Sequence, residues 1–472
     1  MLLIRGGTLV DGSGARSGDL LIQDERIAAV GDHLEAPGAT VLDASGALVI
    51  PGGIDVHTHF DLPVGHVRSA DDFRTGTIAA ACGGTTCVID FAGAGRESPE
   101  EALRAWHAKA RGKAAVDYGF HLTVTEVPEP ADEARALFAS FLDQGVASVK
   151  LYMAYPDRLM VDDATLSRAL RAGRETGVRV CVHAEDGAEV ERRVAEAVAA
   201  GRRHPGWIPQ VRPPEVEAAA VRRAAVLANE AGAPLYVVHL SSGAGLDAVR
   251  SANVGSVRVL AETCPQYLFL TSELLTAQGD EALDFVCAPP LRSDEDRRAL
   301  WGGLADGSIQ VVATDHCPFT KRARRRGTAG RADGPRDFTE IPGGLPGVET
   351  RLSLAYQGVR QGWLTLESWV AAVAGTPARL FGLAHCKGAL APGLDADVVV
   401  FDPEARKRLD ATSLHMATDH SPYQGTEVLG WAAFTIARGR IVAEGGEPAD
   451  VGPGWGRFVP RRPAVEGARL TA

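Results

Sequence analysis

The feature that most constrains the fold is a regular alternation of apolar, strand-like segments with helix-like segments through the middle of the chain. The predicted strands are 53–59, 85–90, 117–124, 147–152, 179–184, 235–240, 257–262 and 309–315. Stretches rich in Ala, Leu, Arg and Glu lie between most of them, at 99–113, 163–176, 214–231 and 293–305, and these residues favour helix. Apolar strands that alternate with helices are typical of a buried parallel sheet. Eight such repeats predict a closed (β/α)₈ TIM barrel.

An open, doubly wound sheet is the alternative fold. No Gly-x-Gly-x-x-Gly turn follows the first predicted strand, and this absence disfavours a dinucleotide-binding sheet.

The two ends of the chain have a different texture, with short β-rich segments separated by turns. They lie at 2–4, 8–10, 19–22, 26–30 and 40–42, and again at 397–401, 428–429, 431–437 and 440–443. We therefore expect one small β-sandwich domain formed by both ends. The predicted division is 1–50 and 385–472 for this domain and its tail, and 51–384 for the barrel. Within the barrel, 320–340 is predicted to be a solvated loop that contains the basic run 321–326.

Charge and cysteine usage narrow the class of protein. A formal net charge of −11 argues against binding to nucleic acid or to an anionic membrane. The chain shows no secretory signal and no apolar run long enough to cross a membrane. The seven cysteines form no Cys-x-x-Cys pair, which argues against a disulfide framework or a thiolate zinc site. We expect a reduced, cytoplasmic protein.

Polar residues stand where the predicted barrel strands end, and catalytic side chains of such barrels lie at that end. They are His57, His59, Lys150, His183, His239 and Asp315. A single strand-end histidine is more often a structural hydrogen-bonding group, but six matching positions favour a metal centre. Imidazole and carboxylate suit zinc and neighbouring divalent metals. The remaining histidines lack this pattern and are predicted to be structural.

Lys150 requires a separate explanation, because a protonated lysine has no lone pair for a metal. Burial beside metals would favour the neutral amine, which can add carbon dioxide to form a carbamate. A carbamate has two oxygens and can bridge two metal ions, which lie about 3.5–4 Å apart in such sites.

Several motifs resemble those of one known family. They are Pro51-Gly-Gly-Ile-Asp-Val-His-Thr-His-Phe60, Lys150-Leu-Tyr-Met-Ala-Tyr155, Glu262-Thr-Cys-Pro-Gln-Tyr267, Ala288-Pro-Pro-Leu-Arg292, Thr314-Asp-His-Cys-Pro-Phe319 and Pro346-Gly-Val-Glu349. Together they are similar to the dihydropyrimidinase/D-hydantoinase family of the amidohydrolase superfamily, over nearly the whole chain.

The resemblance implies a binuclear metal centre. His57 and His59 would bind the more buried ion, His183 and His239 the second, and carboxylated Lys150 would bridge them. Asp315 would ligate the first ion and act as general base toward a bridging hydroxide. The resemblance also implies two divalent ions, with zinc expected first and manganese or cobalt as alternatives, and a homotetramer.

The implied reaction is the opening of a small cyclic amide or ureide, a dihydropyrimidine or a hydantoin, to an N-carbamoyl amino acid. Tyr155 would donate a hydrogen bond to the developing oxyanion. By their position over the barrel mouth, Leu62, Val64 and Leu159 are expected to line the pocket for the ring substituent.

Two residues depart from the family pattern, Ala288 where a serine is usual and Gly343 where an asparagine is usual. Both positions are implied to hold the amide and carbonyl edges of the substrate, largely through main-chain groups. The departures keep open the same chemistry on another cyclic imide or ureide. A non-catalytic scaffold protein of the same family is a further alternative, disfavoured because every ligand position is occupied.

Overall fold

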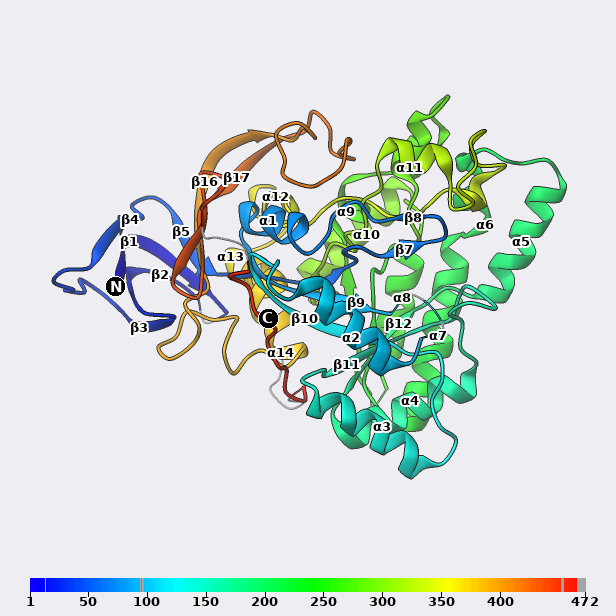
Figure 1. Cartoon of the computed structure of the whole chain (residues 1–472), viewed down its shortest axis with the longest axis horizontal. Helices are drawn as coiled ribbons and strands as arrows, with labels where there is room; N and C mark the ends of the chain where they lie inside the picture. The colour runs from blue at the N-terminus through cyan, green and yellow to red at the C-terminus, as the bar shows by residue number, and fades with distance from the viewer. Residues whose placement is uncertain (13, 94, 96, 256, 451–453, 465–472) are drawn as a thin grey trace.

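The chain folds into a barrel and a separate sheet that is built from both of its ends (Figure 1). The computed structural model describes residues 1–12, 14–93, 95, 97–255, 257–450 and 454–464. The barrel and the terminal sheet confirm the predicted fold class. The predicted domain boundaries stay predictions.

The barrel contains eight parallel strands, and each contains residues of one predicted segment. They are β6 (Gly53–Thr58), β9 (Thr85–Ala92), β10 (Asp117–Thr123), β11 (Ser148–Tyr152), β12 (Arg179–His183), β13 (Leu235–Val237), β14 (Val259–Thr263) and β15 (Val311–Val312). The chain closes the barrel just beyond β15, where the His59 N–H donates to the His316 carbonyl at 2.9 Å. The first and last strands therefore end side by side.

Helices lie around the outside of the barrel (Figure 1). They are α1 (Thr75–Cys82), α2 (Pro99–Ala110), α3 (Ala131–Asp143), α4 (Asp163–Thr176), α5 (Gly187–Ala199), α6 (Ile208–Val211), α7 (Pro214–Ala231), α8 (Gly243–Ala252), α9 (Pro265–Phe269), α10 (Asp294–Ala305), α11 (Lys321–Arg326), α12 (Arg351–Arg360), α13 (Leu366–Val370) and α14 (Thr376–Leu380). In the described part of the chain, no helix is long and apolar enough to cross a membrane.

The part of the barrel interior that lies away from the polar strand-end residues is apolar and closed. Ile54, Val56 and Val311 from the strands pack in one buried cluster with Leu380 and Phe381 at the end of α14. The polar strand-end residues therefore stand above a packed floor, and the barrel is no open channel.

The first barrel strand requires glycine before it. A Cβ on Gly52 would lie 2.1 Å from the hydroxyl oxygen of Thr86, so only glycine lets this segment approach β9.

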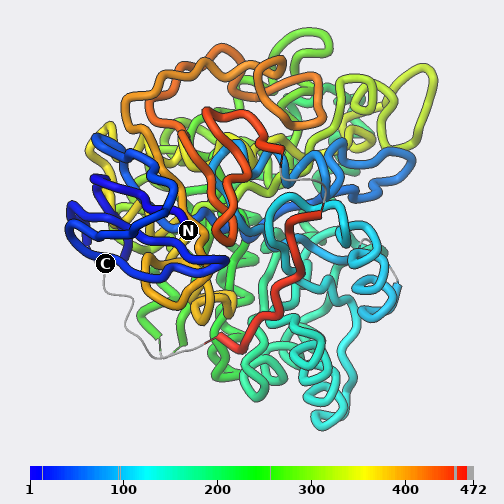
Figure 2. Tube along the Cα trace, turned by 60° about the vertical axis from the view of Figure 1, so that its left-hand side comes forward, coloured from blue at the N-terminus to red at the C-terminus, as the bar shows by residue number. Residues whose placement is uncertain are grey.

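The terminal sheet has nine strands and joins the two ends of the chain. They are β1 (Leu2–Asp11), β2 (Gly14–Gln23), β3 (Arg26–Gly31), β4 (Thr40–Asp43), β5 (Leu48–Pro51), β16 (Val398–Arg408), β17 (Glu427–Ala437), β18 (Arg440–Glu444) and β19 (Glu447–Pro448). The two ends meet where β5 pairs antiparallel with β16. The C-terminal segment then runs back along the barrel (red in Figure 2), where Val459 N–H donates to the Tyr118 carbonyl.

One local prediction is wrong. Residues 320–340 are not simply a solvated loop, because they contain α11 and a short 3₁₀ helix, η4 (Phe338–Glu340). Arg324 of the basic run is fully buried. Runs of like charge are usually solvated, but here backbone carbonyls surround one of the cations.

A buried cluster of charges joins the barrel to the terminal sheet. Lys387 Nζ lies 2.8 Å from Asp117 at the start of β10, and 2.6 Å from Asp397, which precedes β16. It also contacts Asp395 at 3.0 Å, while Arg438 after β17 contacts Asp117 at 3.1 Å. Burial alone would lower the pKa of Lys387, but Asp397 and Asp117 outweigh it and raise this pKa well above its usual value.

We predict that Lys387→Met lowers the free energy of unfolding by about 3–5 kcal/mol, because it leaves buried carboxylates without their cation. Denaturant unfolding followed by circular dichroism measures this. Lys113→Met is the matched control, since Lys113 is exposed and its removal should change stability by less than about 0.5 kcal/mol. Equal midpoints for the two variants would contradict a structural role for the cluster.

Candidate active site

Three of the predicted residues meet where β6 and β15 end. The Nε2 atoms of His57 and His59 each lie 3.1 Å from Oδ1 of Asp315. In the described part of the chain, this is the one group of histidine, cysteine or acidic side chains close enough to share a metal ion.

Two further histidines converge from the neighbouring strands. His183 at the end of β12 and His239 just after β13 are both buried, and Nδ1 of His183 lies 2.9 Å from Nε2 of His239. The His239 ring centroid is 5.3 Å from that of His57. The two groups of side chains are therefore adjacent.

Lys150 of β11 reaches the first of these groups. Its side chain is buried, and Nζ lies 3.1 Å from Nε2 of His57. Nζ also stands 4.1 Å from the ring centroid of Phe91 and 4.9 Å from that of Tyr152. Burial lowers the pKa of this ammonium, although Asp315 and Glu262 oppose the change.

The protonation states of His59, His239 and Asp315 suit metal ligands. Burial lowers the pKa of His59 to about 4 and that of His239 well below its usual value, so both imidazoles stay neutral. Burial would raise the pKa of Asp315, but the neighbouring imidazoles, His57 first, hold it well below the usual value. Neutral imidazole nitrogens and a carboxylate are the forms that bind a divalent cation.

Two buried glutamates orient the histidines. Glu262 of β14 contacts Nδ1 of His57 and accepts from the Tyr236 hydroxyl at 2.9 Å. Glu185 lies 2.8 Å from Nε2 of His183 and pairs with Arg212. Each glutamate binds the ring nitrogen that faces away from the centre, which turns the other nitrogen inward.

Sequence reasoning missed both glutamates, although each has a signal. Glu262 ends the seventh predicted strand, where the rule applied to the other strands would have selected it. Glu185 follows His183 by two residues, the same spacing as His57 and His59, which returns a side chain to the same side of a strand.

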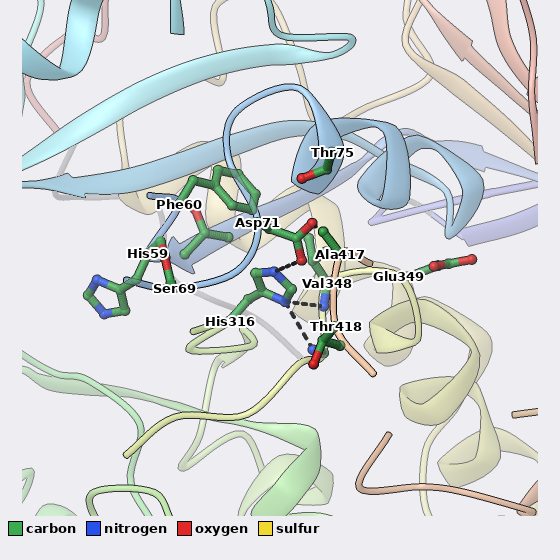
Figure 3. Close-up of polar contacts among 12 residues, drawn as sticks. His59, Phe60, Ser69, Asp71, Thr75, His316, Val348, Glu349, Ala417 and Thr418 are labelled. Carbon is green, nitrogen blue, oxygen red and sulfur yellow. Dashed lines mark hydrogen bonds and ion pairs between the residues drawn. The ribbon is translucent and has the colours of Figure 1, made fainter. Parts of the chain in front are cut away.

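His316 also borders the site, but it faces away from it (Figure 3). Its ring is fully buried, with Nε2 3.1 Å from Oδ2 of Asp71, while Nδ1 accepts from the backbone N–H groups of Gly347 and Val348. Asp71 in turn accepts from the Ala417 N–H at 2.9 Å. This arrangement agrees with the structural role predicted for His316. It fixes the position of His316, which directly follows Asp315 and whose carbonyl closes the barrel.

Three site residues have a strained backbone. Tyr155, His239 and Asp315 have φ values of +66°, +41° and +51°, a region that residues other than glycine rarely adopt. Strain of this kind persists only where surrounding contacts impose it. Burial raises the pKa of the Tyr155 hydroxyl, so it stays protonated and can donate.

A cavity of about 500 Å³ opens above these groups. All the residues predicted to contact a substrate line it: Leu62, Val64, Tyr155, Leu159, Ala288 and Gly343. His59, Lys150, His183, His239 and Asp315 form part of its wall as well. Its size is in the range of small-molecule sites, and its wall combines apolar side chains with a few convergent polar groups.

The donor set fits a metal centre. His57, His59 and Asp315 direct two ring nitrogens and one carboxylate oxygen to a common point, where Lys150 Nζ also contacts His57. The facing nitrogens of His183 and His239, 2.9 Å apart, form a second point. Nitrogens of His57 and His59 share one carboxylate oxygen at 3.1 Å, and those of His183 and His239 face each other at 2.9 Å, so nitrogen and oxygen donors of the kind that bind a divalent cation converge in one buried place.

Comparison with known proteins agrees with this geometry. The model of the amidohydrolase family matches residues 48–442. The D-hydantoinase of Geobacillus stearothermophilus is 41% identical over 97% of this chain and 96% of its own, and the D-phenylhydantoinase of Escherichia coli O9:H4 (strain HS) is 40% identical over 98% and 99%. The crystal structure of dihydropyrimidinase from Brevibacillus agri NCHU1002 superposes with a TM-score of 0.94 at 38% identity, over 98% of this chain and 99% of that one. This chain belongs to the amidohydrolase family, within its hydantoinase and dihydropyrimidinase group.

Proposed function

We propose that this protein is a binuclear metal-dependent hydrolase that opens the ring of hydantoins or dihydropyrimidines to N-carbamoyl amino acids. The observation that carries the proposal is the convergence of six strand-end residues below one cavity of about 500 Å³. The relatives named D-hydantoinase, D-phenylhydantoinase and dihydropyrimidinase support the choice of ring.

Two divalent ions would be held by the residues already described. His57, His59 and Asp315 form one set of ligands. His183 and His239 form the other, and Lys150 contacts His57 of the first set at 3.1 Å. Zinc, manganese and cobalt all suit these donors, and zinc is the first expectation. When bound, the ions would polarise a ring carbonyl and lower the pKa of a water molecule.

Lys150 would bridge the ions as a carbamate. Its lowered pKa favours the neutral amine, which adds carbon dioxide to form a new N–C bond and releases one proton. The product is an N6-carboxylysine with a negative charge, which suits a position between two cations. The aromatic rings of Phe91 and Tyr152 border this position, with centroids 4.1 Å and 4.9 Å from Nζ.

Asp315 and Tyr155 would carry the proton and charge movements. A water oxygen forms a bond to the ring carbonyl carbon while Asp315 accepts the proton that leaves this water. The Tyr155 hydroxyl donates a hydrogen bond to the carbonyl oxygen as negative charge develops there. Asp315 then passes its proton to the ring nitrogen, and the C–N bond breaks to release the open N-carbamoyl product.

The mouth of the cavity would select the ring and its substituent. Leu62, Val64 and Leu159 would contact the substituent, and the main chain at Ala288 and Gly343 would hold the ring edge. A Cβ built on Gly343 would stand in ordinary van der Waals contact with the backbone of Cys287 and Ala288, at 3.6–3.8 Å. A cyclic imide or another ureide is kept as the alternative substrate because Ala288 and Gly343 both depart from the family pattern.

The assembly and location of the protein remain predictions from the family resemblance and from the sequence. A homotetramer is expected, and light scattering that finds a monomer would refute it. The seven cysteines are all free and buried, which accords with the expected cytoplasmic location.

We expect metal-loaded protein to hydrolyse 5-substituted hydantoins or dihydrouracil in a panel that also contains cyclic imides. Product is measured as N-carbamoyl amino acid by mass spectrometry. A preference for cyclic imides would change the proposed substrate but not the proposed type of reaction. No bound metal and no hydrolysis across the panel would instead favour the non-catalytic scaffold.

Lys150→Ala should lose activity by about 100-fold or more, because even groups outside the ligand set change activity or metal affinity by about 10–100-fold. Added propionate should restore part of it by supplying a carboxylate. Metal analysis of active wild-type protein should give two equivalents. Lys113→Ala, at an exposed lysine, should behave as wild type. Full activity of Lys150→Ala without carboxylate would rule out the bridge.

Alanine at Leu62, Val64 or Leu159 should shift the preference among 5-substituted hydantoins toward bulkier substituents. Each change removes apolar contact worth about 1–3 kcal/mol, or about 10–200-fold in kcat/KM between substrates. The ratio of kcat/KM for a 5-benzyl and a 5-methyl hydantoin measures this. Unchanged ratios in all three variants would show that the substituent lies elsewhere.

A further inference from the structure

Arg324 is an unusual buried cation close to the cavity. Its side chain is fully buried, and Nη1 donates to the backbone carbonyls of Leu283 at 2.7 Å, Pro342 at 3.1 Å and Val286 at 3.3 Å. Nη2 donates to the carbonyl of Gly344. One guanidinium therefore joins two segments of chain that are far apart in the sequence.

The basic helix α11 is held in place by contacts around Arg324. Its first turn is capped by the Thr320 hydroxyl, which accepts from the Ala323 N–H. Arg325 forms an ion pair with Asp280 at 2.6 Å, beside the short helix η3 (Glu281–Phe285). The helix thus presents Arg324 to the interior while its neighbours face the surface.

Arg324 has carbonyls where a buried cation usually has a carboxylate. Among the described residues, no acidic side chain lies within ion-pair distance of it. A guanidinium stays charged in proteins and its planar fork of donors can contact several acceptors at once, so four carbonyl oxygens replace its lost hydration. Such an arrangement restricts the four peptide groups strongly, because breaking any contact exposes a buried charge.

The contacted carbonyls belong to the cavity wall. Val286, Pro342 and Gly344 all line the cavity, whereas Arg324 does not and so approaches the wall from behind. In a planar trans peptide the C=O and the following N–H point in opposite directions. The Pro342 carbonyl points to Arg324, so the N–H of Gly343 points away from it, on the cavity side.

The Gly343 N–H is available to a ligand. Within the described residues it has no hydrogen-bond partner, and Gly343 is an exposed residue of the cavity wall. Glycine has no side chain to restrict its own peptide and has the widest backbone freedom of any residue. The next peptide is held by the Gly344 N–H, which donates to the Val286 carbonyl at 2.9 Å. The contact of Arg324 with the Pro342 carbonyl fixes the peptide that carries the Gly343 N–H.

We propose that Arg324 is a positioning residue for the substrate, which holds the Gly343 N–H toward the ring carbonyl that is not attacked. The inference rests on the proposed ring-opening function, and it assigns a role to the basic run that forms α11. Arg324 does not touch the substrate; it acts through the backbone of 342–344.

The test compares Arg324→Met and Arg324→Lys with Arg326→Met. Arg326 is an exposed residue of the same helix, so its variant removes the same charge without touching the carbonyls. Lysine keeps the charge, but its single nitrogen lacks the fork that contacts two loops. Two readouts are used: hydrogen–deuterium exchange of peptides that cover 283–288 and 343–345, and steady-state kinetics on hydantoin and 2-thiohydantoin.

We expect both Arg324 variants to lose exchange protection in these peptides, while Arg326→Met keeps it. KM for hydantoin should rise about 10-fold with kcat within about 3-fold, the size of effect of one lost hydrogen bond. The ratio of kcat/KM between hydantoin and 2-thiohydantoin should fall, since sulfur accepts hydrogen bonds poorly and the variants no longer aim the donor.

Unchanged protection in the folded Arg324→Lys protein would overturn the proposal. So would an equal loss of kcat/KM on both rings, which would indicate a general structural defect. Failure of the proposed function would give a different result, because wild-type protein would hydrolyse neither hydantoin nor 2-thiohydantoin. Hydrogen–deuterium exchange would still decide in that case whether Arg324 orders the two loops.

Discussion

The site depends on the closure of the barrel between its first and last strands. The His59 N–H and the His316 carbonyl form a hydrogen bond of 2.9 Å across this seam. Buried Asp55 supports the same seam from below, where it accepts from the Thr314 hydroxyl at 2.6 Å. The side chains on both sides of this seam therefore point in fixed directions. His57 and His59 face Asp315, although more than two hundred residues lie between the histidines and the aspartate in the chain. The remaining strand ends follow, because parallel strands in a closed barrel all end at one rim.

The same barrel separates an apolar floor from a polar mouth. Side chains from the strands and α14 fill the lower interior, so water has no route through it. Above this floor, low-dielectric surroundings strengthen each charge interaction and make an unpaired group costly. Glu262 and Glu185 satisfy the outward nitrogens of His57 and His183 and leave their inward nitrogens for a ligand. The strained backbone at Tyr155, His239 and Asp315 is held by this packed environment.

Two buried cations outside the centre illustrate different solutions to one problem. Lys387 is neutralised by three carboxylates and joins the barrel to the terminal sheet. Arg324 is surrounded by carbonyls and joins two loops of the cavity wall. A carboxylate partner fixes two side chains, whereas a carbonyl partner fixes the direction of a peptide. In the role proposed for Arg324, the second arrangement sets which backbone groups face a substrate.

The sequence by itself determined the barrel, the terminal sheet and the six strand-end residues. It could do so because strand and helix periodicity are local, and because the end of each strand is visible in the chain. The same rule would have identified Glu262, which ends the seventh strand. Only the tertiary structure decided which nitrogen of His57 and of His183 faces inward, since that depends on the contacts of these rings with Glu262 of another strand and with Glu185. The tertiary structure also decided that one residue of the basic run is buried. A local excess of charge predicts that the run is solvated. The carbonyls that surround Arg324 come from residues 283–286 and 342–344, which only folding brings together.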